Sequence, residues 1–222
     1  MAEATTPGRI YVLAGTNGAG KSSIAGAMLR QAGSEYFNPD EAARLILARN
    51  PGLTGEAANG AAWQVGKRLL ERAVATRGHF AFETTLGGRT ITEILAGAVA
   101  AGLEVRIWYV GLDGPELHVA RVRARVARGG HDIPEARIRA RYDSSRLNLI
   151  RLLPGLTALW VYDNSVDADP QAGAAPAPRL VLHMAATRVV TACGPEDTPE
   201  WAKPIVAAAL KIGATAQARR SR

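Results

Sequence analysis

The chain has 222 residues, of which 47% are hydrophobic and 21% are charged. This composition excludes a disordered chain, and the apolar runs fall well short of the roughly 20 residues that a membrane-spanning helix needs. A single cysteine, Cys193, excludes an internal disulfide framework, and because the first residues lack an apolar leader we expect a cytoplasmic protein. The net charge of +7, carried mostly by arginine, indicates an anionic partner unless it reflects a bias in composition alone.

The first half of the chain alternates short apolar runs with longer stretches of helical periodicity. Residues 38–41 add a helix start, with asparagine at the cap, then proline, and glutamate three positions after the asparagine. In chain order we predict a strand at 9–14, a helix from about 21 to 31, a brief extended segment at 36–37, helices at 42–48 and about 57–77, and a strand at 79–82.

The second half continues this alternation up to residue 165 and then changes character. Residues 167–178 are rich in proline, alanine and glycine, which predicts a loop. In chain order we predict a helix at 90–101, a strand at 105–110, two helices within 116–153 around residues 129–134, a strand at 159–162, a strand or hairpin at 180–190, and a helix at about 204–212 followed by a frayed basic end.

Strands that alternate with helices predict an α/β fold in which a doubly wound, mostly parallel sheet is covered by helices on both faces. We expect a core over residues 1–166 that includes an arginine-rich helical flap at about 116–153. Residues 167–222 are expected to form a C-terminal extension that packs on this core or trails from it.

A glycine-rich loop directly follows the first predicted strand and directly precedes a predicted helix. Its spacing is that of a phosphate-binding loop, in which backbone N–H groups and the helix N-terminus hold phosphate oxygens. Lys21 is expected to reach the β- and γ-phosphates of ATP, and the Ser22 hydroxyl to ligate Mg²⁺. The residues that we expect to bind the nucleotide are Gly15, Thr16, Asn17, Gly18, Ala19, Gly20, Lys21, Ser22 and Ser23.

Two carboxylates are candidates for the acceptor side of a phosphoryl transfer. Asp40 lies in the loop-to-helix segment after the second strand and is the candidate general base, although an acidic residue there also simply favours the helix dipole. Glu83 ends an apolar strand and is followed by threonines, including Thr85, so it can hold magnesium-bound water or a substrate hydroxyl. Asp113 and Asp163 also follow apolar strands, so that pattern alone discriminates little.

Arginines are concentrated in the predicted flap, where like charges at helical spacing favour an anionic ligand between them. The glycines at 129–130 suggest a hinge, so the flap could close on the transferring phosphate and exclude water. A solvated basic face or an RNA-binding patch is the alternative. His131, in the same loop, is read as a hydrogen-bonding or stacking residue rather than as a catalyst. The arginines concerned are Arg121, Arg125 and Arg128, and then Arg137, Arg139, Arg141 and Arg146.

Several blocks occur in the order seen in zeta-toxin-like P-loop kinases. The chain resembles this family from about residue 10 to residue 165, and it looks most like the stand-alone predicted-ATPase branch. It carries Glu83-Thr84-Thr85 where the toxins carry Glu-Gly-Thr. The blocks are the glycine loop, Asn38–Glu41, Phe82–Leu86, Arg121–Val126, Gly129–Glu135 and Tyr162–Ser165.

The resemblance implies a fold like that of nucleoside monophosphate kinases and an ATP-dependent kinase that phosphorylates a hydroxyl group of a small molecule. In the toxins the acceptor is a UDP-N-acetylamino sugar. It also implies that Asp40 is the base, that Glu83 and Thr85 face the acceptor, and that Arg121 lies on the adenine. The arginines implied to contact the transferring phosphate are Arg125, Arg139 and Arg141.

The family's toxins also imply a possible antitoxin-like protein partner for this chain. Two alternatives to a small-molecule kinase stay open from the residues. One is a nucleic-acid-linked P-loop ATPase or polynucleotide kinase, motivated by the basic charge but disfavoured because only 5% of residues are aromatic. The other is a toxin or regulatory module that acts mainly through a protein partner.

Overall fold

The computed structural model of the chain describes residues 7–21, 24, 36–166 and 178–220. Most of the predicted helix at 21–31 and nearly all of the predicted loop at 167–178 therefore lie outside the described residues. The strands are β1 (Arg9–Ala14), β2 (Tyr36–Phe37), β3 (Phe80–Thr84), β4 (Glu104–Gly111), β5 (Ala158–Asp163), β6 (Arg179–Ala185) and β7 (Arg188–Ala192). The helices are α2 (Pro39–Arg49), α3 (Gly55–Ala75), α4 (Arg89–Ala100), α5 (Gly114–Ala127), α6 (Glu135–Leu152) and α7 (Lys203–Arg220), with a short 3₁₀ turn at Leu153–Gly155.

The strands form one sheet in the order β2-β3-β1-β4-β5-β6-β7. Strands β2, β3, β1, β4 and β5 pair in parallel, whereas β6 and β7 pair antiparallel at the end of the sheet. This arrangement confirms the predicted α/β class and the mostly parallel sheet. Because β1 lies between β3 and β4, its carboxyl end is the switch point of the topology, where ligands of such sheets bind.

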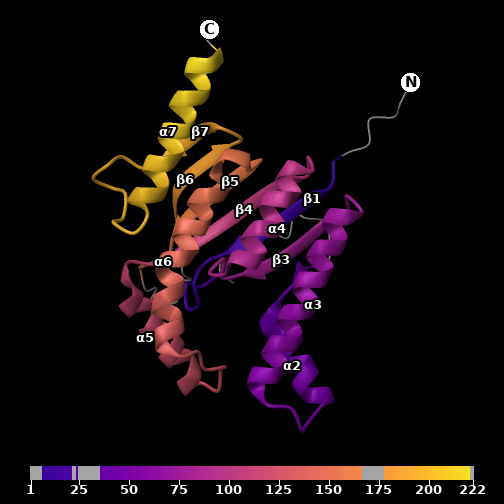
Figure 1. The fold of residues 1–222 in the computed structure, drawn as a ribbon. Helices are drawn as coiled ribbons and strands as arrows, with labels where there is room; N and C mark the ends of the chain where they lie inside the picture. The colour runs from indigo at the N-terminus through magenta and orange to yellow at the C-terminus, as the bar shows by residue number, and fades with distance from the viewer. Residues whose placement is uncertain (1–6, 22–23, 25–35, 167–177, 221–222) are drawn as a thin grey trace.

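Alternate side chains of β1 enter two different clusters of buried residues on the two faces of the sheet. Ile10 and Val12 belong to the larger cluster, which α3, α4, α6 and α7 cover (Figure 1). Tyr11 and Leu13 belong to the cluster on the opposite face, together with Trp108. An almost continuous apolar run is what a parallel strand buried on both faces requires.

Two pairs of helices, α2–α3 and α5–α6, project beyond the carboxyl ends of the central strands (Figure 1). On one side α2 and α3 pack against each other as a hairpin. On the other side α5 and α6 pack around a small cluster of their own that contains Val122 and Ile138, and we call residues 114–152 the flap. Gly129, with a φ of 84°, follows the end of α5 in a conformation that favours glycine.

The region after residue 178 adds to the same sheet. Residues 179–192 form a hairpin, β6–β7, and β6 pairs with β5. Helix α7 runs to Arg220, so the predicted end near residue 212 was wrong, because the alanine-rich segment 213–220 sustains the helix. The domain boundary at residue 166 stays a prediction. Across the described ranges, no helix has the length and apolarity needed to cross a membrane.

Candidate functional site

The glycine loop follows β1 and lies in close contact with three neighbouring elements. Gly15, Gly18 and Gly20 have φ angles of 144°, 82° and 79°, which favour glycine. A Cβ atom at Gly15 would lie 2.2 Å from the Val110 carbonyl oxygen, and one at Gly18 would lie 2.6 Å from the His118 carbonyl oxygen. The glycines thus allow the backbone to turn tightly against β4 and α5, as a phosphate-binding loop requires.

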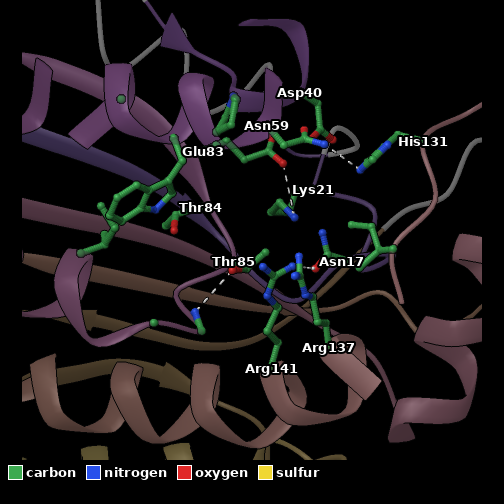
Figure 2. Close-up of a pocket in the computed structure, with 18 of the residues that line it drawn as sticks. Asn17, Lys21, Asp40, Asn59, Glu83, Thr84, Thr85, His131, Arg137 and Arg141 are labelled. Carbon is green, nitrogen blue, oxygen red and sulfur yellow. Dashed lines mark hydrogen bonds and ion pairs between the residues drawn. The ribbon is translucent and has the colours of Figure 1, made fainter. Parts of the chain in front are cut away.

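Lys21 is buried at the end of this loop. Its Nζ donates a hydrogen bond of 2.9 Å to the Gly15 carbonyl and lies 3.3 Å from Oε1 of Glu83 (Figure 2). The Tyr36 hydroxyl donates a 2.8 Å bond to the other oxygen of Glu83. Burial, and then the charge of Glu83, raise the pKa of Tyr36 well above its ordinary value, so its hydroxyl stays protonated and keeps donating. The carboxylate of Glu83 is therefore held from two sides.

Asn17 connects the loop to the flap. Its carbonyl accepts a 2.8 Å hydrogen bond from Nδ1 of His118, and its side-chain oxygen accepts a 2.8 Å bond from Nη1 of Arg141. Burial, together with the charges of neighbouring cations such as Lys21, lowers the pKa of His118 to about 4, against the opposing effect of its bond to the Asn17 carbonyl. His118 is consequently neutral at pH 7 and serves as a fixed donor to the loop.

The turn after β5 supports the loop from the other side. Nδ2 of Asn164 donates a 2.9 Å bond to the Ala19 carbonyl, and Asp163 beside it accepts a 3.0 Å bond from the indole nitrogen of Trp201. The Trp201 ring lies against Gly111, where a Cβ atom would approach it to 2.4 Å. The C-terminal region therefore supports the glycine loop indirectly, through Asp163 and Gly111.

Asp40 occupies the first turn of α2, and its position follows from the predicted helix start. The side chain of Asn38 accepts from the backbone N–H groups of Asp40 and Glu41, which caps the helix. The Asp40 carboxylate is 53% exposed and lies 3.9 Å from Nη1 of Arg125, on the flap. Arg125 also donates a 2.8 Å bond to the His131 carbonyl.

The flap presents one face of α6 to the glycine loop. Arg137 and Arg141 lie on that face, one turn apart (Figure 2). Arg137 lies 3.4 Å from Glu56 of α3. Burial lowers the pKa of Arg141, and the nearby charge of Arg137 lowers it further. Among the described residues no ion pair to a carboxylate is found for Arg141, so its guanidinium is placed to receive an anion.

Arg139 differs from its neighbours. It bonds to Glu116 at 2.7 Å and to Glu135 at 2.8 Å, and it does not line the cavity. On a helix, positions 137 and 139 point in nearly opposite directions, so both cannot face the loop. The structure thus does not support the expected phosphate contact of Arg139, and Arg137 takes its place in our account.

These groups surround one cavity of about 890 Å³. It lies between the glycine loop, the end of β3, the α2–α3 hairpin and the flap, and Asn59 of α3 meets His131 of the flap across it at 3.0 Å. The volume is within the range of sites that enclose a small molecule. The predicted residues among its walls are Asn17, Gly18, Lys21, Asp40, Glu83, Thr85, Arg125, His131 and Arg141.

Other predicted residues of the described chain, such as Gly15 and Gly20, belong to the glycine loop without lining the cavity itself. Arg121 does not line the cavity, but its Nη1 lies 3.9 Å from where a Cβ atom of Gly20 would stand, beside the glycine loop. Ser22 and Ser23 fall outside the described residues. Sequence reasoning missed Asn59, Trp63 and Glu56, because α3 carries no motif. Arg137 was among the predicted flap arginines, but the family resemblance did not place it on the phosphate, although its spacing from Arg141 indicates a shared helix face.

Comparison with known proteins gives the same fold. The AAA_33 family model, an AAA domain, matches residues 10–146. An uncharacterized protein of Haemophilus influenzae is 34% identical over 128 residues, which are 58% of this chain and 88% of that protein.

Among solved structures, the AvrRxo1-ORF1:ORF2 complex with ATP superposes with a TM-score of 0.61 at 15% identity. That match covers 94% of this chain but only 64% of the other, so this chain spans about two thirds of that protein. A putative kinase from Chloroflexus aurantiacus superposes with a TM-score of 0.53 at 16% identity, over 76% of this chain and 95% of the other. The fold is therefore that of P-loop kinases, and the chain belongs to the AAA_33 family.

Proposed function

We propose that the protein is a kinase that transfers the γ-phosphoryl group of Mg-ATP to a hydroxyl group of a small molecule. The observation that carries this proposal is the meeting of three chemistries in one cavity. A phosphate-binding loop with a buried lysine, the exposed carboxylate of Asp40 and the arginines of the flap all line it. An enzyme that only hydrolyses a nucleotide needs space for ATP and water, whereas a transferase also needs space beside the ATP for a second substrate, the acceptor.

The nucleotide half rests on Lys21 and the backbone of the loop. Nζ of Lys21 bonds the Gly15 carbonyl and pairs with Glu83. When ATP is bound, its phosphate oxygens would take over these contacts. Mg²⁺ bound to ATP would supply positive charge to the β- and γ-phosphate oxygens. The oxygen ligands available for it are the Ser22 hydroxyl, expected from the loop motif, and the carboxylate of Glu83, which suits a hard cation.

Asp40 is the better candidate for the base of the two carboxylates. Glu83 accepts a bond from the Tyr36 hydroxyl and is an expected Mg²⁺ ligand, whereas Asp40 is half-exposed and, among the described residues, pairs only with Arg125, at 3.9 Å. In the proposed reaction the acceptor oxygen bonds the γ-phosphorus while the bond to the β–γ bridging oxygen breaks. ADP leaves with that electron pair, and the hydroxyl proton passes to Asp40.

The flap arginines would stabilise the charge of the transferring group. Arg141 is half-buried and, within the described part of the chain, its guanidinium bonds only the neutral side chain of Asn17, and Arg125 and Arg137 line the same cavity. Guanidinium groups in a site shielded from water stabilise developing phosphoryl charge strongly. Thr85, at the end of β3, lines the acceptor side.

The proposal is tested with γ-labelled ATP and a fractionated extract of small metabolites. We expect the label to appear in an organic phosphate ester with the wild-type protein and not with Lys21→Ala. Label that appears only as inorganic phosphate, whatever acceptor is offered, would refute the transferase. A UDP-N-acetylamino sugar, the acceptor implied by the resemblance, is the first pure compound to test.

We propose an antitoxin-like protein partner as a second feature of the system. Its support is that AvrRxo1-ORF1, which shares the fold, was solved in complex with a second protein, AvrRxo1-ORF2. Co-expression with proteins encoded beside this chain, followed by purification of the tagged chain, tests the idea. A stable complex that suppresses ATP turnover supports it, and a lone, fully active chain contradicts it.

A further inference from the structure

The wall of the cavity that α3 forms contains a large apolar side chain that packing within the chain leaves exposed. Eight large hydrophobic residues are exposed in the described part of the chain, and of these only Trp63 lines the cavity, with 41% of its surface accessible. The other seven are Leu45, Leu53, Leu69, Leu147, Val166, Val190 and Leu210.

The helix that carries Trp63 leaves open space beside it. Gly60 lies one turn earlier, on the same face of α3, and also lines the cavity. A Cβ atom at Gly60 would meet nothing within 4 Å, so packing does not require glycine there, and glycine weakens a helix interior. Gly66 is a useful contrast, because a Cβ atom there would lie 2.6 Å from the ring of Phe37. Gly66 serves packing, whereas the cavity wall at Gly60, one turn from Trp63, is open.

Polar groups surround this apolar spot. Glu56 and Asn59 lie on the preceding turns of α3, and Lys67 on the following turn, all within the lining of the cavity. They pair with Arg137, His131 and Glu71 respectively, and a polar group at the edge of a ligand on the indole would compete for these donors and acceptors. An exposed aromatic face with polar groups around its rim is the usual arrangement for binding a flat ring.

We propose that the face of α3 around Trp63 and Gly60 is a ring-binding subsite for the phosphoryl acceptor. The acceptor then carries a flat ring, either an aromatic base or the apolar face of a sugar, which stacks on the indole while its hydroxyl reaches Asp40. That this ring compound is the acceptor rests on the proposed kinase function, whereas the binding of a ring at Trp63 does not.

Ligand-observed NMR titrations in the presence of a non-hydrolysable ATP analogue and magnesium test the subsite. The probes are uridine for a base, N-acetylglucosamine for a sugar ring, and ribitol as a polyol without a ring. We expect at least one ring probe to bind saturably and ribitol not to bind. Uridine alone would identify the base as the source of the ring, and N-acetylglucosamine alone the sugar.

Three variants locate the binding. Trp63→Leu should weaken binding of the ring probe about tenfold or more, because a leucine offers no flat surface. Trp63→Phe should retain most of it, and Leu69→Ala, an exposed position on the same helix outside the cavity, should leave it unchanged. Binding unaffected by Trp63→Leu, or no binding by any ring probe, would overturn the subsite.

Phosphoryl transfer is measured separately on the same samples. Ring binding at Trp63 without transfer to any compound would sink the kinase and leave the subsite standing. Transfer to an acyclic acceptor, with a Michaelis constant that Trp63→Leu does not change, would sink the subsite and leave the kinase standing.

Discussion

His118 makes the stability of the phosphate-loop region depend on pH. The imidazole is 1% exposed, donates to the carbonyl of Asn17, and has a pKa of about 4 in place of its ordinary 6.5. The unfolded chain therefore binds a proton between pH 6.5 and 4 that the folded chain does not. This contribution to stability is complete above pH 6.5 and is lost as the pH falls toward 4.

The size of the effect follows from the shift. A difference of one pKa unit corresponds to about 1.4 kcal/mol, so the full loss approaches about 3 kcal/mol, and about 2 kcal/mol of it falls between pH 7 and pH 5. Other groups titrate in the same range, so the wild-type curve alone cannot isolate His118. The replacement His118→Gln keeps an N–H donor of similar reach and removes the titration.

Urea unfolding at several pH values between 7 and 5 measures the difference. We expect the free energy of unfolding of the wild-type protein to fall by about 2 kcal/mol more than that of His118→Gln over this interval. At pH 7 the two proteins should have similar urea m-values, which shows that the variant is folded. Parallel pH dependences in the two proteins would refute the neutral, buried His118.

Three further predictions concern the loop, the flap and the C-terminal region. Gly18→Ala, which places a Cβ atom 2.6 Å from a carbonyl oxygen at a φ of 82°, should weaken ATP binding about tenfold in calorimetric titrations, while Gly88→Ala, with open space around it, should not. Arg141→Ala should lower the turnover number about a hundredfold in the transfer assay, and Arg139→Ala should change it less than threefold, since it lies outside the cavity; equal losses would contradict the orientation of α6. Trp201→Phe, which loses the bond to Asp163, should raise the Michaelis constant for ATP a few-fold with no change in that for the acceptor; a change confined to the acceptor would contradict it.

The parts of the structure that sequence predicted best are those governed by local chemistry. The glycine loop needs backbone conformations that only glycine adopts readily, and the start of α2 needs its asparagine cap, so both were recognisable from a few residues. The sheet followed from the alternation of strands and helices. The antiparallel β6–β7 hairpin was foreseen only as an alternative, because two short strands and one bent strand have the same pattern.

Contacts between distant segments were not predictable in this way. Trp201 supports the glycine loop through Asp163 and Gly111, which lie 38 and 90 positions away along the chain, and no local pattern marks such a partner. Trp63 lies in a helix that carries no sequence motif, so nothing local marked it either. Helical spacing favours Arg137 over Arg139 as the partner of Arg141 in phosphate binding, because positions 137 and 141 lie one turn apart on one helix face and position 139 points away from it.

The role of Asp40 in phosphoryl transfer is the centre of the account. Mass spectrometry of a metabolite mixture incubated with ATP and either the wild-type protein or Asp40→Asn tests it most directly. The substitution keeps the size of the side chain and leaves the glycine loop intact, so ATP binding, measured in parallel, should persist. We predict that one or a few metabolites gain a phosphoryl group with the wild-type protein and that the rate falls at least a hundredfold with the variant. Full transfer by Asp40→Asn would contradict the assignment of the base, and no phosphorylated metabolite with either protein would contradict the kinase itself.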